Sequence, residues 1–404
     1  MNITYISMSR IPSEQANTFQ VIQMCDAFVS IGHRLVLLYP QRINTPAMAH
    51  IKDIYTYYGT ANHFPLVSLP SIDFLWPAQR RLARVPLILK LLQERLFFPL
   101  MQISYFRSVR SYLKDRFAGI LYLRDLSLVI YLMRKLPDLV PYIIFEAHKF
   151  PSLNWEIKWL PHLAKMGGVV TLTNYMKQLF CQAAVPADKI LVAPDGVDLH
   201  RFEHVADKLA ARQSLNLPVQ RKIIGYTGHL YAWKGVATLV AAAHFLDDRY
   251  LICLVGGTTE DVADMRRLVN EQKLTKKVRV VGYVPPADIP TYLAAADILV
   301  LPNSGKQEIN RYYTSPLKLF EYMAARRPIV ASDLPAVREI LNDTNAVFFR
   351  PDQPRDLAQK IQWLGDHPVE TDALAQQGRI DVEMYTWQNR AKRIIEFASG
   401  LGIA

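Results

Sequence analysis

The sequence predicts an α/β protein built from two doubly wound, Rossmann-like domains with parallel sheets. The chain has 404 residues, which is enough for two or three domains of roughly 150 residues each. Hydrophobic residues make up 50% of it and no segment has a low-complexity composition, so cores of ordinary size are expected. Short apolar runs alternate with helical patterns along most of the chain, which is typical of parallel sheets covered by helices.

The first half of the chain contains six expected strands. A helical pattern over residues 17–30, ending at Gly32, lies between the first two. The strands are predicted at residues 3–7, 35–39, 120–123, 142–146, 169–173 and 190–193.

The second half repeats this alternation after a polar segment at residues 200–220. We therefore expect a first domain at residues 1–200, completed by a C-terminal helix at 386–404, and a second at 201–385. Ligands bind beyond the carboxyl ends of the strands in open parallel sheets, so the chemistry is expected in a cleft between domains that face each other. Strands are predicted at residues 222–226, 251–255, 278–281, 298–301, 329–331 and 347–349.

Positive charge is concentrated in the first half. The formal net charge is +11, and residues 1–201 hold 22 Lys and Arg against 13 Asp and Glu. Residues 73–116 mix nine basic residues with seven aromatic ones, which suits an anionic membrane surface. Surface helices with solvated charges explain the same pattern equally well. No nucleic-acid-binding motif accompanies the charge, so nucleic acid is not an expected partner.

The location of the protein is predicted to be cytoplasmic. Cys25, Cys181 and Cys253 each lie in an apolar stretch, which indicates reduced, buried thiols rather than disulfides or a metal site. Residues 1–7 have the pattern of a strand and not of a signal peptide. The longest uncharged candidate for a membrane span, between Arg95 and Arg107, is much shorter than the ~20 residues a spanning helix needs.

The most informative segment begins a helix at Ser315, an N-cap residue type, followed by Pro316 at the first helical position. The amides of Leu317 and Lys318 would then face outward and suit a phosphate or diphosphate, with the lysine adding charge. Glu321 lies one turn further and can accept hydrogen bonds from a ribose diol. An ordinary capped helix with an exposed glutamate is the alternative.

A second segment supports a nucleotide site. The strand at 223–227 leads into Gly228 and His229 and, five residues later, Lys234. Glycine allows close approach of the backbone, and the two basic side chains can hold one anion in place of a metal. Taken singly, a structural histidine and a lysine at a helix start would explain the same residues.

Two further turns are expected at the same edge of the sheet. Gly256 and Gly257 follow one strand, and Tyr283 and Val284 follow the next, where a nucleobase can stack. A tight connection between strand and helix explains the glycine pair equally well.

In combination these segments closely resemble glycosyltransferase family 4, whose members are retaining nucleotide-sugar glycosyltransferases of the GT-B fold. The resemblance covers most of the chain and is stronger in the second half. Its motifs are Gly228-His229 with Lys234-Gly235, the Gly-Tyr-Val turn at 282–284, the helix at 315–324, the strand at 328–332, Asp195-Gly196-Val197-Asp198 and Gly32-His33.

The resemblance implies a role for each donor-site residue. Lys234 and His229 would hold the donor diphosphate together with the amides at 317–318, and Glu321 would bind the ribose. The family usually has arginine where this chain has His229. Its second glutamate, eight positions before Glu321, is Tyr313 here, so the usual contact with the donor sugar is lost or replaced. Glu308 is nearby but out of register, and the role is not assigned to it.

In the first domain the resemblance places His148 beside the donor sugar and the reacting carbon, although a structural histidine at a strand end is the alternative. The loop at residues 9–17 takes the place of the family's glycine-rich loop, and Asn17 can cap the following helix and turn its amides toward the diphosphate. Arg124 and Asp125 are candidate acceptor contacts or a solvated loop pair.

The predicted function is therefore a retaining glycosyltransferase with His148 and Lys234 as catalytic residues. The donor would be UDP- or GDP-linked, the acceptor a lipid-linked or cell-surface glycan precursor, and neither a metal nor another cofactor is expected. The enzyme would work in the cytoplasm, peripherally at the inner face of the membrane. Two alternatives remain, a nucleotide-sugar epimerase of the same fold and a noncatalytic nucleotide- or lipid-binding protein.

Overall fold

The computed structural model describes residues 1–73 and 96–403. The chain divides into two compact units. The first unit contains residues 1–171, 177–193 and 390–404, and the second contains residues 172–176 and 194–389.

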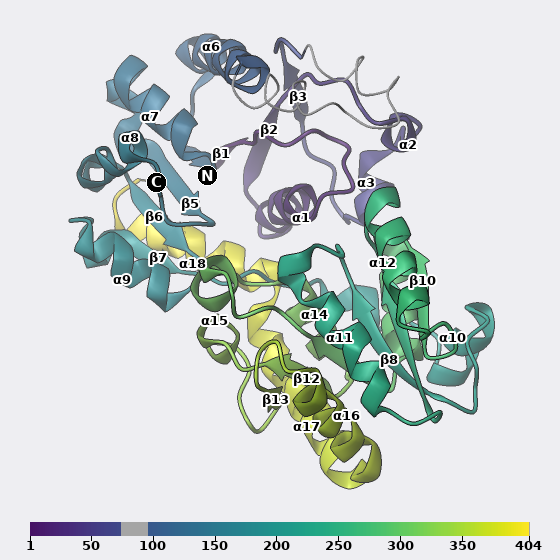
Figure 1. Cartoon of the computed structure of the whole chain (residues 1–404). Coiled ribbons are helices and arrows are strands. Elements are labelled where there is room, and N and C mark those ends of the chain that lie inside the picture. The colour runs from purple at the N-terminus through teal and green to yellow at the C-terminus, as the bar shows by residue number, and fades with distance from the viewer. Residues whose placement is uncertain (74–95, 404) are drawn as a thin grey trace. The chain divides into compact units, whose positions relative to one another are not determined.

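The first unit is built on a parallel sheet of seven described strands in the order β3-β2-β1-β4-β5-β6-β7 (Figure 1). All six predicted strands are confirmed. The additional strand β3 pairs with β2 at the edge of the sheet, and sequence reasoning missed it because only its last residue, Leu69, is buried. The strands are β1 (Asn2–Ile6), β2 (Arg34–Pro40), β3 (Leu66–Leu69), β4 (Ile120–Leu123), β5 (Ile143–Ala147), β6 (Gly168–Thr171) and β7 (Ile190–Val192).

Helices connect consecutive parallel strands of this sheet. Helix α1 buries most of its length, and every residue of β4, β5 and β6 is buried, as expected for a sheet covered on both faces. The helices are α1 (Ala16–Ser30), α2 (Pro46–Ala49), α3 (Ile54–Tyr58), α6 (Phe98–Arg116), α7 (Leu126–Lys135), α8 (Asn154–Ile157), α9 (Asn174–Gln182) and α18 (Trp387–Gly400), the last two with residues in both units.

The second unit contains a six-stranded parallel sheet with the order β10-β9-β8-β11-β12-β13. Its six strands confirm the prediction, and the polar segment at 200–220 holds a helix but no described strand. The strands are β8 (Lys222–Thr227), β9 (Tyr250–Val255), β10 (Val278–Gly282), β11 (Ile298–Leu301), β12 (Ile329–Ser332) and β13 (Val347–Phe349). The helices are α10 (Lys208–Ser214), α11 (Val236–Ala242), α12 (Thr259–Glu271), α13 (Ile289–Ala295), α14 (Leu317–Ala324), α15 (Pro335–Arg338), α16 (Pro354–Asp366) and α17 (Pro368–Asp381).

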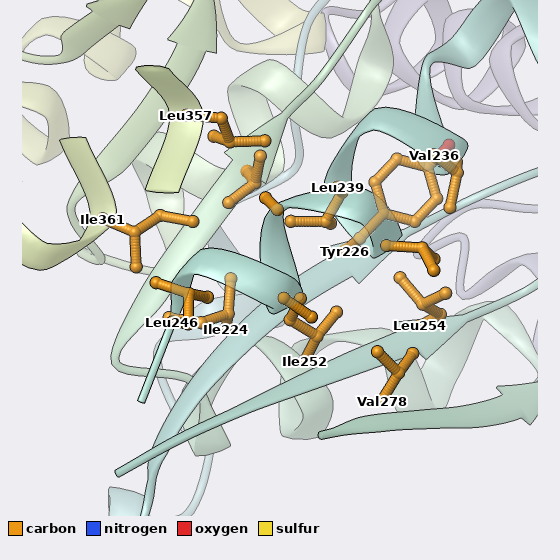
Figure 2. Packing of buried hydrophobic residues seen from close by; sticks show 14 of the residues in the cluster. Ile224, Tyr226, Val236, Leu239, Leu246, Ile252, Leu254, Val278, Leu357 and Ile361 are labelled. Atoms are coloured by element: carbon orange, nitrogen blue, oxygen red, sulfur yellow. The ribbon is translucent and has the colours of Figure 1, made fainter. Parts of the chain in front are cut away.

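The largest apolar cluster of the second unit fixes β8 against α11 and α16. Figure 2 shows Ile224 and Tyr226 of β8 among Leu239 of α11, Ile252 of β9 and Ile361 of α16. Burying a side chain of this size contributes about 1.5–3 kcal/mol. The ends of β8 and α11 are therefore firmly held, and so is the short loop that joins them.

Both sheets reverse their strand order at one point. In the first unit β1 lies between β2 and β4, and in the second β8 lies between β9 and β11. Loops at such a switch point diverge to opposite faces of the sheet and leave room for a ligand. The two candidate regions are the loops after β1 and β4, and the loops after β8 and β11.

The structure bears on the predictions made for the cysteines and for a membrane span. Cys25 and Cys253 are buried, but Cys181 is only partly buried, which corrects the prediction for that thiol, because it lies near the end of the amphipathic helix α9. In the described part of the chain, no helix combines the length and the apolar character needed to cross a bilayer. Much of the basic segment at 73–116 lies outside the described residues, and its second half forms α6.

Candidate functional site

The predicted glycine turns of the second unit lie directly against one another. Gly228, at φ +120°, donates its amide hydrogen to the carbonyl of Val255 over 2.8 Å. A Cβ atom on Gly256 would lie 2.4 Å from the Gly228 carbonyl oxygen. Gly256 in turn donates to the carbonyl of Gly282. The ends of β8, β9 and β10 therefore form one continuous edge, which only glycine permits at the contact points.

Lys234 is placed by a tight 3-10 turn, η6 (Ala232–Lys234), that ends at Gly235. Gly235 has φ +71°, and a Cβ atom there would lie 1.8 Å from the carbonyl oxygen of Pro302. The ammonium nitrogen of Lys234 lies 3.8 Å from the centroid of the Trp233 ring. Burial lowers the pKa of Lys234 to about 8, so its charge is poorly solvated in the free protein.

Lys318 forms the second half of a cationic pair. Its side chain comes from α14, the residue is only 9% exposed, and Nζ lies 3.7 Å from the centroid of the Tyr226 ring. Among the described residues no acceptor lies within hydrogen-bond distance of this nitrogen. Burial, followed by the charge of Lys234, lowers the pKa of Lys318 well below its usual value. Among the described residues, neither ammonium group has a carboxylate within ion-pair distance, and two such poorly solvated neighbours are suited to a multiply charged anion.

The start of α14 differs from the prediction. Pro316 is the N-cap, and the Ser315 hydroxyl instead accepts a hydrogen bond from the Asp195 amide over 3.0 Å. The prediction that Ser315 caps the helix was therefore wrong, because a partner 120 residues away competes for its oxygen. The amides of Leu317 and Lys318 still lie in the first turn, where a helix offers them no acceptor.

Glu321 lies one turn after Lys318 and has a partner that the sequence did not reveal. Its carboxylate is 3.7 Å from the guanidinium of Arg201, which also donates to the carbonyl of Pro286 in the loop after β10. Burial raises the pKa of Glu321, while Arg201 and then Lys318 act in the opposite direction. Both cations favour the ionised carboxylate, the form that accepts two hydrogen bonds from a diol.

Tyr313 ends a π-helical turn, η9 (Ile309–Tyr313). Its hydroxyl donates to a carboxylate oxygen of Glu308 over 3.3 Å. Glu308 is thus the neighbour of position 313 in space, although the sequence spacing gave no ground for assigning it a role.

The remaining predicted donor residues lie along the same edge of the second unit. His229 stacks on Tyr231 with ring centroids 4.8 Å apart, and its carbonyl accepts a hydrogen bond from the Tyr226 hydroxyl. Tyr283 is 45% exposed, whereas Val284 packs against a hydrophobic cluster. An exposed aromatic ring beside a packed aliphatic side chain is a surface on which a base can stack.

In the first unit one pocket brings four predicted residues together. Asn17, Arg124, Asp125 and His148 all line a cavity of about 520 Å³ at the end of β1. The prediction that Asn17 caps α1 was wrong. The N-cap is Gln15, because α1 begins at Ala16, and the Asn17 amide donates to the Ser9 hydroxyl instead.

Arg124 and Asp125 both have partners within the protein and are not a solvated loop pair. Arg124 donates to the carbonyl of Asn17 over 3.1 Å and to the side chain of Gln20. Asp125 is the N-cap of α7 and accepts the amide hydrogen of Leu128 over 2.9 Å. Burial raises the pKa of Asp125.

His148 contacts a buried carboxylate, Glu146 of β5, through its Nε2 atom. Glu146 also accepts hydrogen bonds from Gln20 over 2.8 Å, from Arg390 over 3.1 Å and from the Tyr122 hydroxyl. Burial alone would raise the pKa of Glu146, but Arg390, His148 and Arg124 together hold it well below its usual value. Sequence reasoning did not select Glu146, although a charged residue inside an otherwise apolar strand was the available signal.

Comparison with known proteins gives a family match for part of the second unit. Residues 221–367 match the family described as Glycosyl transferases group 1. D-inositol 3-phosphate glycosyltransferase of Corynebacterium urealyticum is 24% identical over 53% of this chain and 51% of its own length. Alpha-D-kanosaminyltransferase of Streptomyces kanamyceticus is 25% identical over 58% of this chain and 60% of its own length. The chain thus spans little more than half the length of these curated relatives.

Solved structures match the chain over almost its whole length. Anabaena HepE, crystallised with UDP, has a TM-score of 0.75 at 16% identity and is covered completely, with 99% of this chain aligned. Sucrose-phosphate synthase from Thermosynechococcus elongatus has a TM-score of 0.76 at 19% identity, with 99% of both chains covered. The chain therefore has the GT-B fold of two Rossmann-like domains, and the segment that holds Lys234, Lys318 and Glu321 matches the group 1 glycosyl transferases.

Proposed function

We propose that this protein is a glycosyltransferase that takes a sugar from a nucleoside diphosphate sugar. The observation that carries this proposal is the pair of poorly solvated lysines, partly buried Lys234 and buried Lys318, with the carboxylate of Glu321 one turn after Lys318. These groups match the charges and hydrogen-bonding needs of a diphosphate and its ribose. They lie within the segment that matches the group 1 glycosyl transferases, and HepE, which has the same fold, was crystallised with UDP.

We assign the donor contacts as follows. Lys234, Lys318 and the first amides of α14 bind the diphosphate, with His229 at its edge. Glu321, held by Arg201, binds the ribose. The base, uracil or guanine, packs at the turn that carries Tyr283 and Val284. Fixed ammonium groups supply the charge that a metal would otherwise bring, so we propose transfer without a metal or other cofactor.

We propose a retaining reaction. The bond between the anomeric carbon and the diphosphate breaks, and the two lysines stabilise the charge that develops on the leaving group. The departing phosphate oxygen takes the proton of the acceptor hydroxyl on the same face of the sugar. His148, whose ring is oriented by Glu146, lies beside the reacting carbon in this proposal.

We propose that the acceptor is a lipid-linked or cell-surface glycan precursor and that the enzyme works at the inner face of the membrane. Helix α6 supports this location because it combines exposed apolar side chains, Leu100 and Ile103, with Arg107 and Lys114 on the same helix. Such a surface binds anionic lipid through apolar burial and charge together.

The decisive experiment is incubation with a panel of UDP- and GDP-sugars, chosen by the thermal shift that each nucleoside diphosphate produces. Release of nucleoside diphosphate that depends on an added acceptor supports transfer, and the anomeric coupling in the NMR spectrum of the product tests retention. A changed sugar without an acceptor would instead indicate an epimerase. Binding without either reaction would indicate a noncatalytic protein.

A further inference from the structure

We propose that the second unit has a further anion site, which binds a phosphate group at the amino ends of its strands. The site is a pocket of about 330 Å³. Its wall includes Lys222, the first residue of β8, Ile298, the first residue of β11, and Pro328, which precedes β12. The proposed diphosphate site follows the carboxyl end of β8, so the two sites lie at opposite ends of the same strand.

Basic side chains outnumber carboxylates in the wall of this pocket. Two of the described residues that line it are acidic, Asp297 and Asp372. Both oxygens of Asp297 are already used, one by Lys208 at 2.9 Å and the other by the buried Arg212. Asp372 is exposed and accepts a hydrogen bond from Gln376. The four basic residues of the wall are Lys208, Lys222, Arg326 and Arg327.

Three of these cations, Lys222, Arg326 and Arg327, have no carboxylate within ion-pair distance in the part of the chain that the structure describes. Lys222 donates to the carbonyl of Gly365 near the end of α16. Arg327 donates to the carbonyl of Ala294 near the end of α13 over 2.7 Å. Carbonyls at helix ends orient these side chains, but they carry only partial charge and do not neutralise them. Positive charge therefore remains in excess at the pocket.

The behaviour of Arg327 shows that the charges are close enough to affect one another. Burial lowers its pKa, and Asp297 opposes this decrease, whereas Arg212 and Arg326 add to it. Like charges in a partly buried cluster are destabilised unless an anion joins them. A phosphate group would supply two negative charges and accept the paired hydrogen bonds that guanidinium groups donate.

The size of the pocket favours a small ligand. Ile298 and Leu364 contribute buried apolar side chains to its wall, and such side chains keep water from screening the charges. A volume of about 330 Å³ is at the lower end of the range for small-molecule sites and suits one phosphate group with a small substituent. The phosphate can belong to a free metabolite or to a lipid head group, and the experiment distinguishes these two sources.

Arg326 is the residue to substitute, because its backbone favours glycine. It lies just beyond α14 with φ +50°, and its amide donates to the carbonyl of Met323 over 3.1 Å. Glycine is the usual residue at this position after a helix, since a Cβ atom is disfavoured in left-handed backbone. Arg326→Gly therefore removes a guanidinium group from the pocket without straining the fold.

The test uses the full-length protein loaded with saturating UDP, which fills the proposed diphosphate site. Inorganic phosphate and glycerol 3-phosphate are titrated by calorimetry at constant ionic strength. We expect Arg326→Gly to weaken binding of these anions about tenfold or more, because a charge-assisted hydrogen bond is lost. Its urea midpoint should not fall, and its UDP affinity should stay within about twofold of the wild type.

Lys273→Gly is the matched control. Lys273 is an exposed cation at φ +57° in the equivalent position after α12, and its amide donates to the carbonyl of Asn270 over 3.0 Å. It does not line the pocket, so this variant should bind phosphate as the wild type does. Equal losses in both variants, or none in Arg326→Gly, would contradict the assignment.

Sedimentation with phosphatidylcholine vesicles that contain phosphatidic acid identifies the source of the phosphate. Vesicle binding that weakens in Arg326→Gly, without binding of either free anion to the wild type, would identify a lipid head group. Binding of the free anions that depends on Arg326 would identify a soluble metabolite. If neither the free anions nor the vesicles bind in a manner that depends on Arg326, the proposal is overturned.

A further variant separates this inference from the proposed function. Lys234→Ala should lose UDP binding but still bind inorganic phosphate in the absence of nucleotide. If the wild type binds no nucleotide and Arg326→Gly still loses phosphate binding, the transferase proposal fails and the phosphate pocket stands. Phosphate binding that is lost in Lys234→Ala and retained in Arg326→Gly would place the anion at the diphosphate site and refute the pocket.

Discussion

Lys234 and Lys318, which we propose bind the donor diphosphate, are poorly solvated in the ligand-free protein. Both ammonium groups lie against aromatic rings, and desolvation lowers the pKa of each. The charged forms of both lysines are therefore destabilised in the free protein. A bound diphosphate would stabilise them. The difference between free and bound states favours tight binding of a leaving group that carries two or more negative charges.

Removing one of these charges should affect the reaction more than the fold. We expect Lys234→Ala to lower turnover more than a hundredfold, because loss of one charged contact to a developing anion costs roughly 3 kcal/mol of barrier. Steady-state release of nucleoside diphosphate measures it. Lys276→Ala, an exposed lysine of the same unit, should retain full activity. Turnover near the wild-type value in Lys234→Ala would remove this residue from the mechanism.

Nucleotide binding should depend on pH through the same lysine. Because the pKa of Lys234 is about 8, its ammonium loses the proton as pH rises through that value. Phosphate monoesters lose their last proton with a pKa of about 6, so the diphosphate of UDP keeps its charge above pH 7. We expect the Kd of UDP to rise roughly tenfold or more between pH 7 and 9.5, measured by calorimetry.

In the ligand-free protein, the contribution of Lys234 to stability should rise with pH, whereas the affinity for UDP falls. The unfolded chain, with the ordinary lysine pKa of 10.5, binds more protons than the folded protein between about pH 8 and 10.5. The contribution of Lys234 to the free energy of unfolding therefore rises with pH over this window. Lys234→Met should flatten both trends, with Lys318 as the remaining titrating group, and a steep UDP dependence that persists unchanged in that variant would contradict the explanation.

At the scale of elements, the loop between β8 and α11 is held from outside rather than by its own sequence. The carbonyl of Trp233 accepts hydrogen bonds from the Ser304 amide over 3.2 Å and from the Asn310 side chain. Asn310 is fully buried and also donates to the carbonyl of Ser304 over 3.0 Å. The segment after β11 therefore sets the position of Lys234, the residue next to Trp233.

Loss of the Asn310 hydrogen bonds should lower both the stability of the fold and the affinity for UDP. We expect Asn310→Ala to lower the free energy of unfolding by about 1–3 kcal/mol, because the carbonyls of Trp233 and Ser304 would each lose one hydrogen-bond donor. UDP affinity should fall as well, since the turn that carries Lys234 is released. Urea denaturation and calorimetry measure the two effects.

The control is Asn270→Ala, an exposed asparagine near the end of α12, which should stay within about 0.5 kcal/mol of the wild type. Wild-type UDP affinity in a folded Asn310→Ala protein would show that the loop keeps its position without this hydrogen bond.

At the scale of the whole molecule, the C-terminal helix α18 is tied to the centre of the first sheet. Arg390, buried and 244 residues after Glu146, contacts its carboxylate at 3.1 Å and donates to the carbonyl of Ala193. Residues 390–404 belong to the first unit although nearly 200 residues separate them from the rest of it. A buried ion pair therefore joins the C-terminal helix α18 to strand β5 of the first sheet.

Breaking this ion pair should destabilise the folded protein. We expect Arg390→Gln to lower the free energy of unfolding by about 3 kcal/mol, because Glu146 would remain buried with less compensating charge. Lys392→Gln, two residues away and exposed, is the matched control and should change it little. A urea transition of Arg390→Gln that coincides with the control would show that Arg124 and His148 suffice to neutralise the carboxylate.

Membrane association is also a property of the whole protein. We expect the wild type to sediment with vesicles that contain anionic lipid, and this binding to weaken as salt is raised. The double substitution Leu100→Ser and Ile103→Ser, which removes two exposed apolar side chains of α6, should reduce it severalfold. Ile380→Ser, which removes an even more exposed apolar side chain from the second unit, is the control. No sedimentation of the wild type at low salt would rule out the proposed location.

Local patterns in the amino-acid sequence were enough to predict the strands of both sheets. All twelve predicted strands are present, because apolar runs bounded by turns are local patterns that survive in any buried parallel sheet. The edge strand β3 was missed since it lacks such a run. Lys234, Lys318 and Glu321 were also predicted from local spacing, because a strand end or a helix start positions each of them within a few residues.

The contact partners of the site residues could not be predicted and follow from how the chain packs. Arg201 forms an ion pair with Glu321, and Arg390 forms one with Glu146. The amide of Asp195 donates a hydrogen bond to the Ser315 hydroxyl. More than a hundred residues separate the partners in each case. Such contacts leave no periodic trace in the sequence, because they depend on which strand ends meet at the edge of a sheet. Burial, too, is a property of the packed molecule, and it is burial that shifts the pKa of the lysines on which the proposed chemistry depends.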